Sequence, residues 1–123
     1  MIAGYTLYDY IKSIGEQIPI TIIAMGQAAS MAAILLQAGR RRVMSPQAWL
    51  LIHEISAGSA GSIGNLRDDM KWFERLNDQG TDILASRAKI SRDEVKKLMD
   101  RKDCWISADE ALGYGFVDEV SFA

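Results

Sequence analysis

The segment of residues 19–53 constrains the fold most strongly, because it has the pattern of a strand, a helix and a second strand. Residues 20–25 are rich in β-branched side chains without polar alternation, which is typical of a strand buried on both faces of a parallel sheet. Residues 27–38 are rich in Ala, Leu and Met and lie between Gly26 and Gly39, which predicts a helix. We therefore predict that residues 19–25 and 48–53 are adjacent parallel strands of one sheet, joined by a right-handed connection.

The rest of the chain alternates between helical patterns and a final strand. Apolar residues recur at helical spacing in residues 5–17 and again in residues 63–87, where Gly80 interrupts the pattern. Ser91 and Ser107 each precede a glutamate by three residues, so both predict a capping box that opens a short helix. The second of these helices is expected to end at Gly113, and residues 116–120 to form the last strand. The order of elements predicts an α/β fold.

Residues 56–62, with the sequence SAGSAGS, are too small and too flexible to pack in a core and predict an extended loop or exposed strand. The helix that follows is about 25 residues long at ~1.5 Å each, so it projects beyond a core of this size. Uncovered apolar surface of that kind usually marks an interface. We expect the protein to associate with itself through this region.

Composition and charge exclude several kinds of protein. A chain of 123 residues holds one moderate core, so we expect a single domain over residues 1–123. Fourteen Lys and Arg against sixteen Asp and Glu leave no basic stripe that could follow nucleic acid. The longest apolar runs fall short of the ~20 residues that span a membrane. The single cysteine, Cys104, predicts no disulfide, no metal site and a reducing, intracellular environment.

Ser30 is the first candidate for chemistry. It lies between a predicted buried strand and the body of a helix, at the edge of the sheet where ligands bind in open α/β folds. The small neighbours Gly26, Ala28 and Ala29 leave room for a substrate carbonyl, and backbone N–H groups at the helix start can stabilise an oxyanion. An ordinary serine in a first helical turn is the alternative interpretation.

His53 is the only histidine and therefore the only imidazole base that this chain offers to a serine. It ends a strand predicted to run parallel to the strand before Ser30, so both residues lie at one edge of the sheet. A histidine bonded only to the backbone is the alternative. A carboxylate would be needed to hold the imidazole, and spacing does not choose among four aspartates: Asp100, Asp103, Asp109 and Asp118.

Four segments carry a family resemblance. Residues 26–32 read GQAASMA, residues 51–53 read LIH, residues 102–111 read KDCWISADEA, and residues 114–118 read YGFVD. In this order they resemble the nucleophile segment, the histidine segment and the two C-terminal motifs of the Clp protease proteolytic subunit, a family of self-compartmentalised serine peptidases. The match is collinear over essentially the whole chain.

The resemblance implies that Ser30 is the nucleophile, His53 the general base and Asp103 the group that orients it, with the N–H of Met31 in the oxyanion hole. It implies peptide hydrolysis through an acyl-enzyme, with no cofactor and no metal. The triad order of Ser, His and Asp is permissible because geometry defines a triad.

The resemblance also implies an α/β fold of the Clp protease/crotonase type, a spiral of ββα units that is incomplete at the N-terminus. Residues 56–88 correspond to the family's projecting handle, through which two rings meet. The implied partners are further copies of the chain, an AAA+ ATPase unfoldase and a peptide or unfolded protein, in the cytoplasm.

Two features depart from the family pattern. A Gly-Gly pair that helps to form the oxyanion hole would fall just upstream of Met1, and the family's His-Gln-Pro is here His53-Glu54-Ile55. Loss of one oxyanion donor typically lowers the rate ~10²–10³-fold. We expect the 123-residue chain to react slowly or not at all with a serine-directed fluorophosphonate, and a version extended upstream to be labelled at Ser30.

Two alternatives remain at this point. One is a truncated or non-catalytic subunit that keeps only the assembly surfaces. The other is a crotonase-like acyl-CoA enzyme, since that superfamily shares the spiral architecture and does not require a Ser, His and Asp set.

Overall fold

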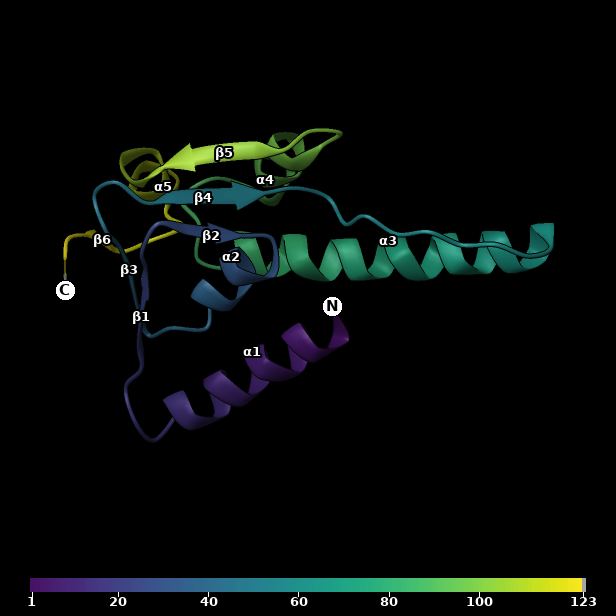
Figure 1. The fold of residues 1–123 in the computed structure, drawn as a ribbon. Coiled ribbons are helices and arrows are strands. Elements are labelled where there is room, and N and C mark those ends of the chain that lie inside the picture. The colour runs from purple at the N-terminus through teal and green to yellow at the C-terminus, as the bar shows by residue number, and fades with distance from the viewer. Residues whose placement is uncertain (123) are drawn as a thin grey trace.

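Two small sheets form the centre of the molecule in the computed structural model, which describes residues 1–122 (Figure 1). The strands of the first sheet are all parallel, in the order β1 (Thr21–Ala24), β3 (Arg41–Met44) and β6 (Glu119–Val120). In the second sheet β2 pairs in parallel and β5 antiparallel with the central strand, in the order β2 (Gln27–Ala29), β4 (Trp49–Ile52) and β5 (Cys104–Ser107). The helices are α1 (Ile2–Gly15), α2 (Met31–Leu36), α3 (Ile63–Ala85), α4 (Arg92–Met99) and α5 (Ala108–Tyr114).

The prediction that residues 19–25 and 48–53 lie side by side in one sheet is wrong. β1 pairs with β3, whereas β4 belongs to the other sheet and pairs with β2. The reason is a change of direction at Gly26, whose φ of 68° is in the left-handed region that glycine tolerates best. The chain leaves the first sheet after β1 and enters the second at Gln27, and it makes the same passage between β3 and β4. Each sheet therefore contains one parallel pair from this segment, β1 with β3 in the first and β2 with β4 in the second.

The helix predicted over residues 27–38 is shorter than expected at its start, because Gln27–Ala29 form β2 and only Met31–Leu36 are helical. Pairing with β4 outweighs the helix propensity of the two alanines in this segment. The last strand is also shorter, with only Glu119–Val120 paired to β3. Gly80 does not interrupt α3. An added Cβ there would meet the Tyr5 hydroxyl at 3.0 Å, so glycine lets α1 approach α3 closely.

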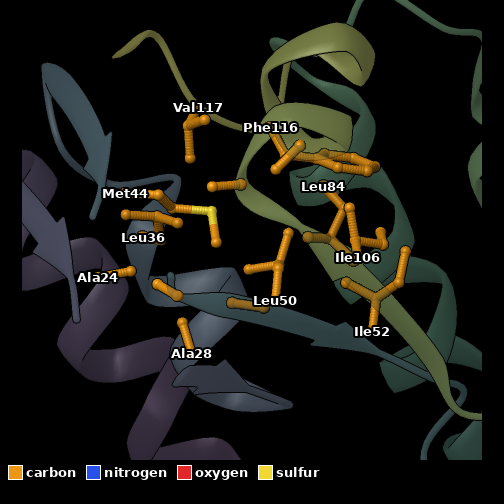
Figure 2. Close-up of a cluster of buried hydrophobic side chains, with 14 of the residues drawn as sticks. Ala24, Ala28, Leu36, Met44, Leu50, Ile52, Leu84, Ile106, Phe116 and Val117 are labelled. Carbon is orange, nitrogen blue, oxygen red and sulfur yellow. The ribbon is translucent and has the colours of Figure 1, made fainter. Parts of the chain in front are cut away.

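One apolar core joins the two sheets to the helices that cover them (Figure 2). Leu36 of α2, Met44 of β3, Leu50 of β4 and Phe116 are each 0% exposed. From α3 only the C-terminal part reaches this core, through Leu84. The core is therefore built at the end of α3 that lies nearest the sheets.

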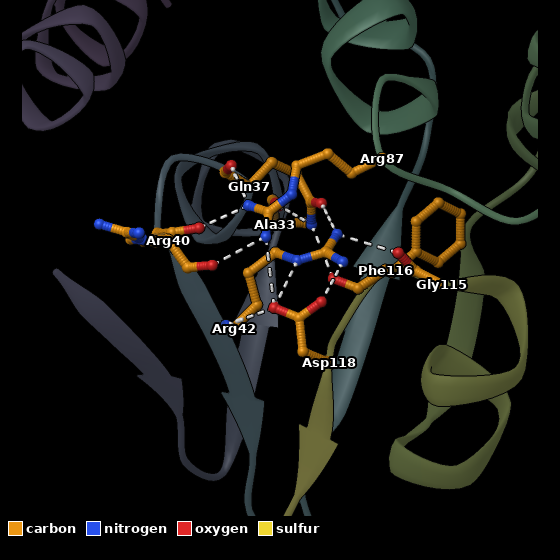
Figure 3. A network of polar contacts seen from close by, with 9 residues as sticks. Ala33, Gln37, Arg40, Arg42, Arg87, Gly115, Phe116 and Asp118 are labelled. Carbon is orange, nitrogen blue, oxygen red and sulfur yellow. Dashed lines mark hydrogen bonds and ion pairs between the residues drawn. The ribbon is translucent and has the colours of Figure 1, made fainter. Parts of the chain in front are cut away.

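A partly buried ionic network fixes the C-terminal segment to β3 (Figure 3). Arg42 is only 3% exposed, and its guanidinium donates hydrogen bonds to Asp118 Oδ1 at 2.7 Å, Gln37 Oε1 at 2.7 Å and the Gly115 carbonyl at 2.9 Å. Arg87, just after α3, donates to Asp118 Oδ2 at 3.3 Å. The hydrogen bonds from Arg42 lower the pKa of Asp118 below its ordinary value of 3.8, against a smaller opposing effect of burial. This network ties four parts of the chain together.

Replacing Asp118 with asparagine should lower the free energy of unfolding by about 1–2 kcal/mol at neutral pH, because the buried Arg42 loses its anionic partner while solvent screens a carboxylate that is 38% exposed. The native pKa lies below the unfolded one, so the contribution is complete above the unfolded-state pKa of about 4 and is lost as the pH falls through the native value. Urea unfolding across this pH range measures the contribution of Asp118 to the free energy of unfolding. Asp68→Asn, which changes an exposed aspartate, is the control. An equal deficit at neutral and strongly acidic pH would contradict the ionic explanation.

Within the handle, residues 56–88, the loop of residues 56–62 and the first part of α3 extend away from the core, as Figure 1 shows, whereas the end of α3 packs against it. Within the described chain residues 56–62 form a loop without a strand, and Ser59 is hydrogen-bonded to the Asp69 side chain of α3. Ser62 caps α3 by accepting a hydrogen bond from Asn65 N–H at 3.2 Å. Ile63 is 75% and Met70 58% exposed. None of the helices within residues 1–122 combines the length and the apolar character needed to cross a bilayer.

Candidate active site

Ser30 is held in a strained conformation at a sharp turn from β2 into α2. Its φ of 56° and ψ of −119° are rarely adopted by residues other than glycine. Hydrogen bonds on both sides maintain it, because its N–H donates to the Leu51 carbonyl at 3.0 Å and its own carbonyl accepts from the N–H of Ala33 at 3.0 Å. Strain of this kind clusters at functional sites, and a nucleophilic serine on a strand-to-helix turn is a recurrent example.

His53 lies beside Ser30, as the shared sheet edge predicts. β2 and β4 are parallel, so Ser30 and His53 follow the carboxyl ends of neighbouring strands. A hydrogen bond joins Ser30 Oγ to His53 Nε2. Ser30 is exposed and His53 half-buried, so substrate can reach the hydroxyl while the imidazole is packed in place. This pairing has the geometry of a nucleophile and its base.

The second ring nitrogen determines the tautomer of His53. Its Nδ1 is hydrogen-bonded to the main-chain carbonyl of Glu54. A carbonyl oxygen only accepts, so Nδ1 carries the proton and Nε2 of the neutral ring is free to accept the Ser30 proton. The imidazole is therefore in the tautomer that a general base requires.

Asp103 makes no hydrogen bond to His53 within residues 1–122, and its side chain is exposed. In the chain, however, both residues adjoin the same strand pair. Ile52 and Cys104 are the last paired residues of β4 and β5, and His53 and Asp103 are the residues next to them. Asp109 follows the far end of β5. Asp118 is bonded to Arg42 beside the other sheet, and Asp100 caps the end of α4.

A cavity of about 260 Å³ is lined in part by Ser30 and His53. Its walls are mainly apolar, with side chains from α1, α2, α3 and α4, and include Met31, Ile34, Leu84 and Met99. Such a cavity suits an apolar group of a bound ligand. Met31 also begins α2, so its N–H has no acceptor within the helix.

Other groups near the site do not suggest a different chemistry. Burial raises the pKa of the Cys104 thiol, which disfavours the reactive thiolate. Among the residues that the structure describes, no three His, Cys, Asp or Glu side chains form a group that could hold a metal ion. Sequence reasoning did not identify Asn77, which lines the cavity and accepts a hydrogen bond from Ile55 N–H at 2.9 Å. An asparagine in a polar helix gives no signal of such a contact.

Comparison with known proteins identifies one family. The model of the Clp protease family matches residues 1–123. The chain is 34% identical to "ATP-dependent Clp protease proteolytic subunit 3" of Rhodococcus jostii over 98% of its length and 60% of the relative. It is 33% identical to the "ATP-dependent Clp protease proteolytic subunit" of Deinococcus radiodurans over 96% of the chain and 57% of the relative.

A third relative, "ATP-dependent Clp protease proteolytic subunit 2" of Tropheryma whipplei, is 32% identical over 96% of the chain and 65% of its own length. The chain thus spans about 60% of the length of the curated relatives that it matches.

Proposed function

Because this chain belongs to the Clp protease family, we propose that it hydrolyses peptide bonds by serine chemistry, with Ser30 as nucleophile and His53 as general base. The observation that carries the proposal is the hydrogen bond from Ser30 Oγ to His53 Nε2 at a strained strand-to-helix turn. The names of the relatives describe those proteins as protease proteolytic subunits, which supports peptide hydrolysis.

The proposed reaction uses these groups in turn. Ser30 Oγ attacks the peptide carbonyl carbon while His53 Nε2 takes the hydroxyl proton, and the N–H of Met31 stabilises the oxyanion. His53 then donates the proton to the leaving amine as the C–N bond breaks, which leaves an acyl group on Ser30. Water, deprotonated by His53, hydrolyses that ester and restores the serine.

We propose Asp103 as the group that stabilises the imidazolium formed in this reaction. The Glu54 carbonyl offers only a dipole to Nδ1–H, whereas a carboxylate offers a full charge. The position of Asp103 supports this role, because Asp103 and His53 adjoin Cys104 and Ile52, the last paired residues of β5 and β4.

Covalent labelling tests the proposed function. The product of the whole gene, treated with a serine-directed fluorophosphonate and analysed by peptide mass spectrometry, should carry one adduct, on Ser30. Ser30→Ala should remove the adduct, and Ser13→Ala, which changes an exposed serine of α1, should keep it. An adduct on another serine, or none at Ser30, would contradict the proposal.

We further propose that the protein associates with itself through the handle and receives unfolded polypeptide from an ATP-dependent partner. The exposed apolar side chains of α3 support the first part, and the "ATP-dependent" names of the relatives support the second. Sedimentation at micromolar concentration should show an oligomer that Met70→Asp weakens and Lys71→Asp, a neighbouring exposed polar position, does not. A stable monomer would remove this proposal.

A further inference from the structure

We propose that Asn77 is a positioning residue for His53 and acts through the single peptide unit between Glu54 and Ile55. This inference rests on the proposed function for its catalytic consequence. Its structural part, that Asn77 fixes the tautomer of His53, is tested separately below.

The two ends of that peptide unit are both hydrogen-bonded. At one end the carbonyl of Glu54 accepts from His53 Nδ1–H. At the other end the N–H of Ile55 donates to Asn77 Oδ1 at 2.9 Å. A carbonyl and the following N–H lie in one rigid plane, so fixing the N–H also fixes the direction of the carbonyl. Asn77 thereby sets the direction in which the acceptor of the imidazole points.

Within residues 1–122 no other hydrogen bond supports this peptide. β4 ends at Ile52, and within the described chain residues 54–58 make no hydrogen bond besides the two at this peptide unit. The Glu54 side chain is exposed and Ile55 only half-buried. Without the Asn77 side chain, rotation of the Glu54–Ile55 peptide would therefore meet little resistance.

Asn77 itself is held firmly. It lies within α3, one residue after Leu76, whose carbonyl accepts a hydrogen bond from the Tyr5 hydroxyl at 2.8 Å. Its own carbonyl accepts from the Thr81 hydroxyl at 2.9 Å. The amide thus projects from a part of α3 that is packed against the body of the protein, which suits a group that must hold another in place.

The consequence for His53 is chemical. With the carbonyl fixed, Nδ1 keeps its proton and Nε2 accepts from Ser30. With the carbonyl free to turn away, the tautomer with the proton on Nε2 becomes accessible, and in that form Nε2 cannot accept the proton of Ser30.

Nitrogen NMR of isotopically labelled histidine tests the inference directly, since His53 is the only histidine and gives a single imidazole. The wild-type ring should carry its proton on Nδ1. Asn77→Ala should shift the population toward Nε2–H and slow fluorophosphonate labelling of Ser30 about ten- to hundredfold. Asn77→Asp, which keeps an acceptor oxygen, should restore both. Asn65→Ala, at an exposed position of the same helix, should change neither.

An unchanged tautomer in folded Asn77→Ala would overturn the inference, as would Asn77→Asp behaving like Asn77→Ala, or an equal shift in Asn65→Ala. If the tautomer shifts as expected but the wild-type protein is never labelled at Ser30, the role of Asn77 toward His53 stands and only the serine chemistry fails.

Discussion

Replacing His53 with alanine should lower kcat for peptide hydrolysis by about 10⁶-fold, nearly as much as replacing Ser30 itself. The hydroxyl of Ser30 is hydrogen-bonded to Nε2 of the only imidazole in the chain. Without that base the serine stays protonated and is a poor nucleophile at neutral pH. Turnover of a fluorogenic peptide by the whole gene product measures the effect.

The double variant tests whether Ser30 and His53 act together in one reaction path. Ser30→Ala combined with His53→Ala should be no slower than either single variant, because each change alone removes the same reaction path. Circular dichroism establishes that the variants are folded. Activity within tenfold of wild type in folded His53→Ala, or additive losses in the double variant, would show that His53 is not the base.

The sequence predicted the family and the class of fold correctly. The motifs around Ser30, His53 and Asp103 identified the Clp protease family, which the comparison over residues 1–123 confirms. The α/β fold and the long handle helix are also as expected. These features could be predicted because they depend on local patterns: a serine between small residues, capping serines before α4 and α5, and helical spacing from Ile63 onward. Membership in this family also disfavours the acyl-CoA alternative.

The division into two sheets could not be predicted from the same patterns. Residues 20–29 contain two short strands separated by a left-handed glycine, and each strand is too short to show its own periodicity. β2 is made of residues with a strong helix propensity, and only its pairing with β4 makes it extended. Long-range pairing of this kind cannot be detected in a short stretch of sequence.

The candidate site, too, could be predicted only in part. That Ser30 and His53 share one edge of a sheet was predicted from parallel strands, and the structure joins them although the strands concerned are β2 and β4. The contacts of the Glu54 carbonyl and of Asn77 were not predicted, because a main-chain oxygen has no sequence signature and an asparagine can lie on any face of a helix.

Replacing Asp103 with asparagine should lower kcat about 10⁴-fold and leave the fold intact. The exposed carboxylate makes no hydrogen bond to His53 within the described chain, so its loss removes no structural contact there. In the proposed reaction, however, His53 becomes a cation. A carboxylate beside the end of the β4–β5 pair would stabilise that cation, whereas an asparagine amide gives no charge and can favour the wrong tautomer.

A matched variant separates this role from a general effect of charge. Asp100→Asn removes an exposed carboxylate three residues away, at the end of α4, and should leave kcat unchanged. If Asp103→Asn lowers kcat less than tenfold, the Glu54 carbonyl alone is sufficient to orient His53, and Asp103 has no catalytic role. If both variants lower kcat equally, the effect comes from the charge of the loop and not from a contact with His53. Only a large loss of kcat in Asp103→Asn, with kcat unchanged in Asp100→Asn, agrees with a triad in which Asp103 contacts His53 once the imidazole is protonated.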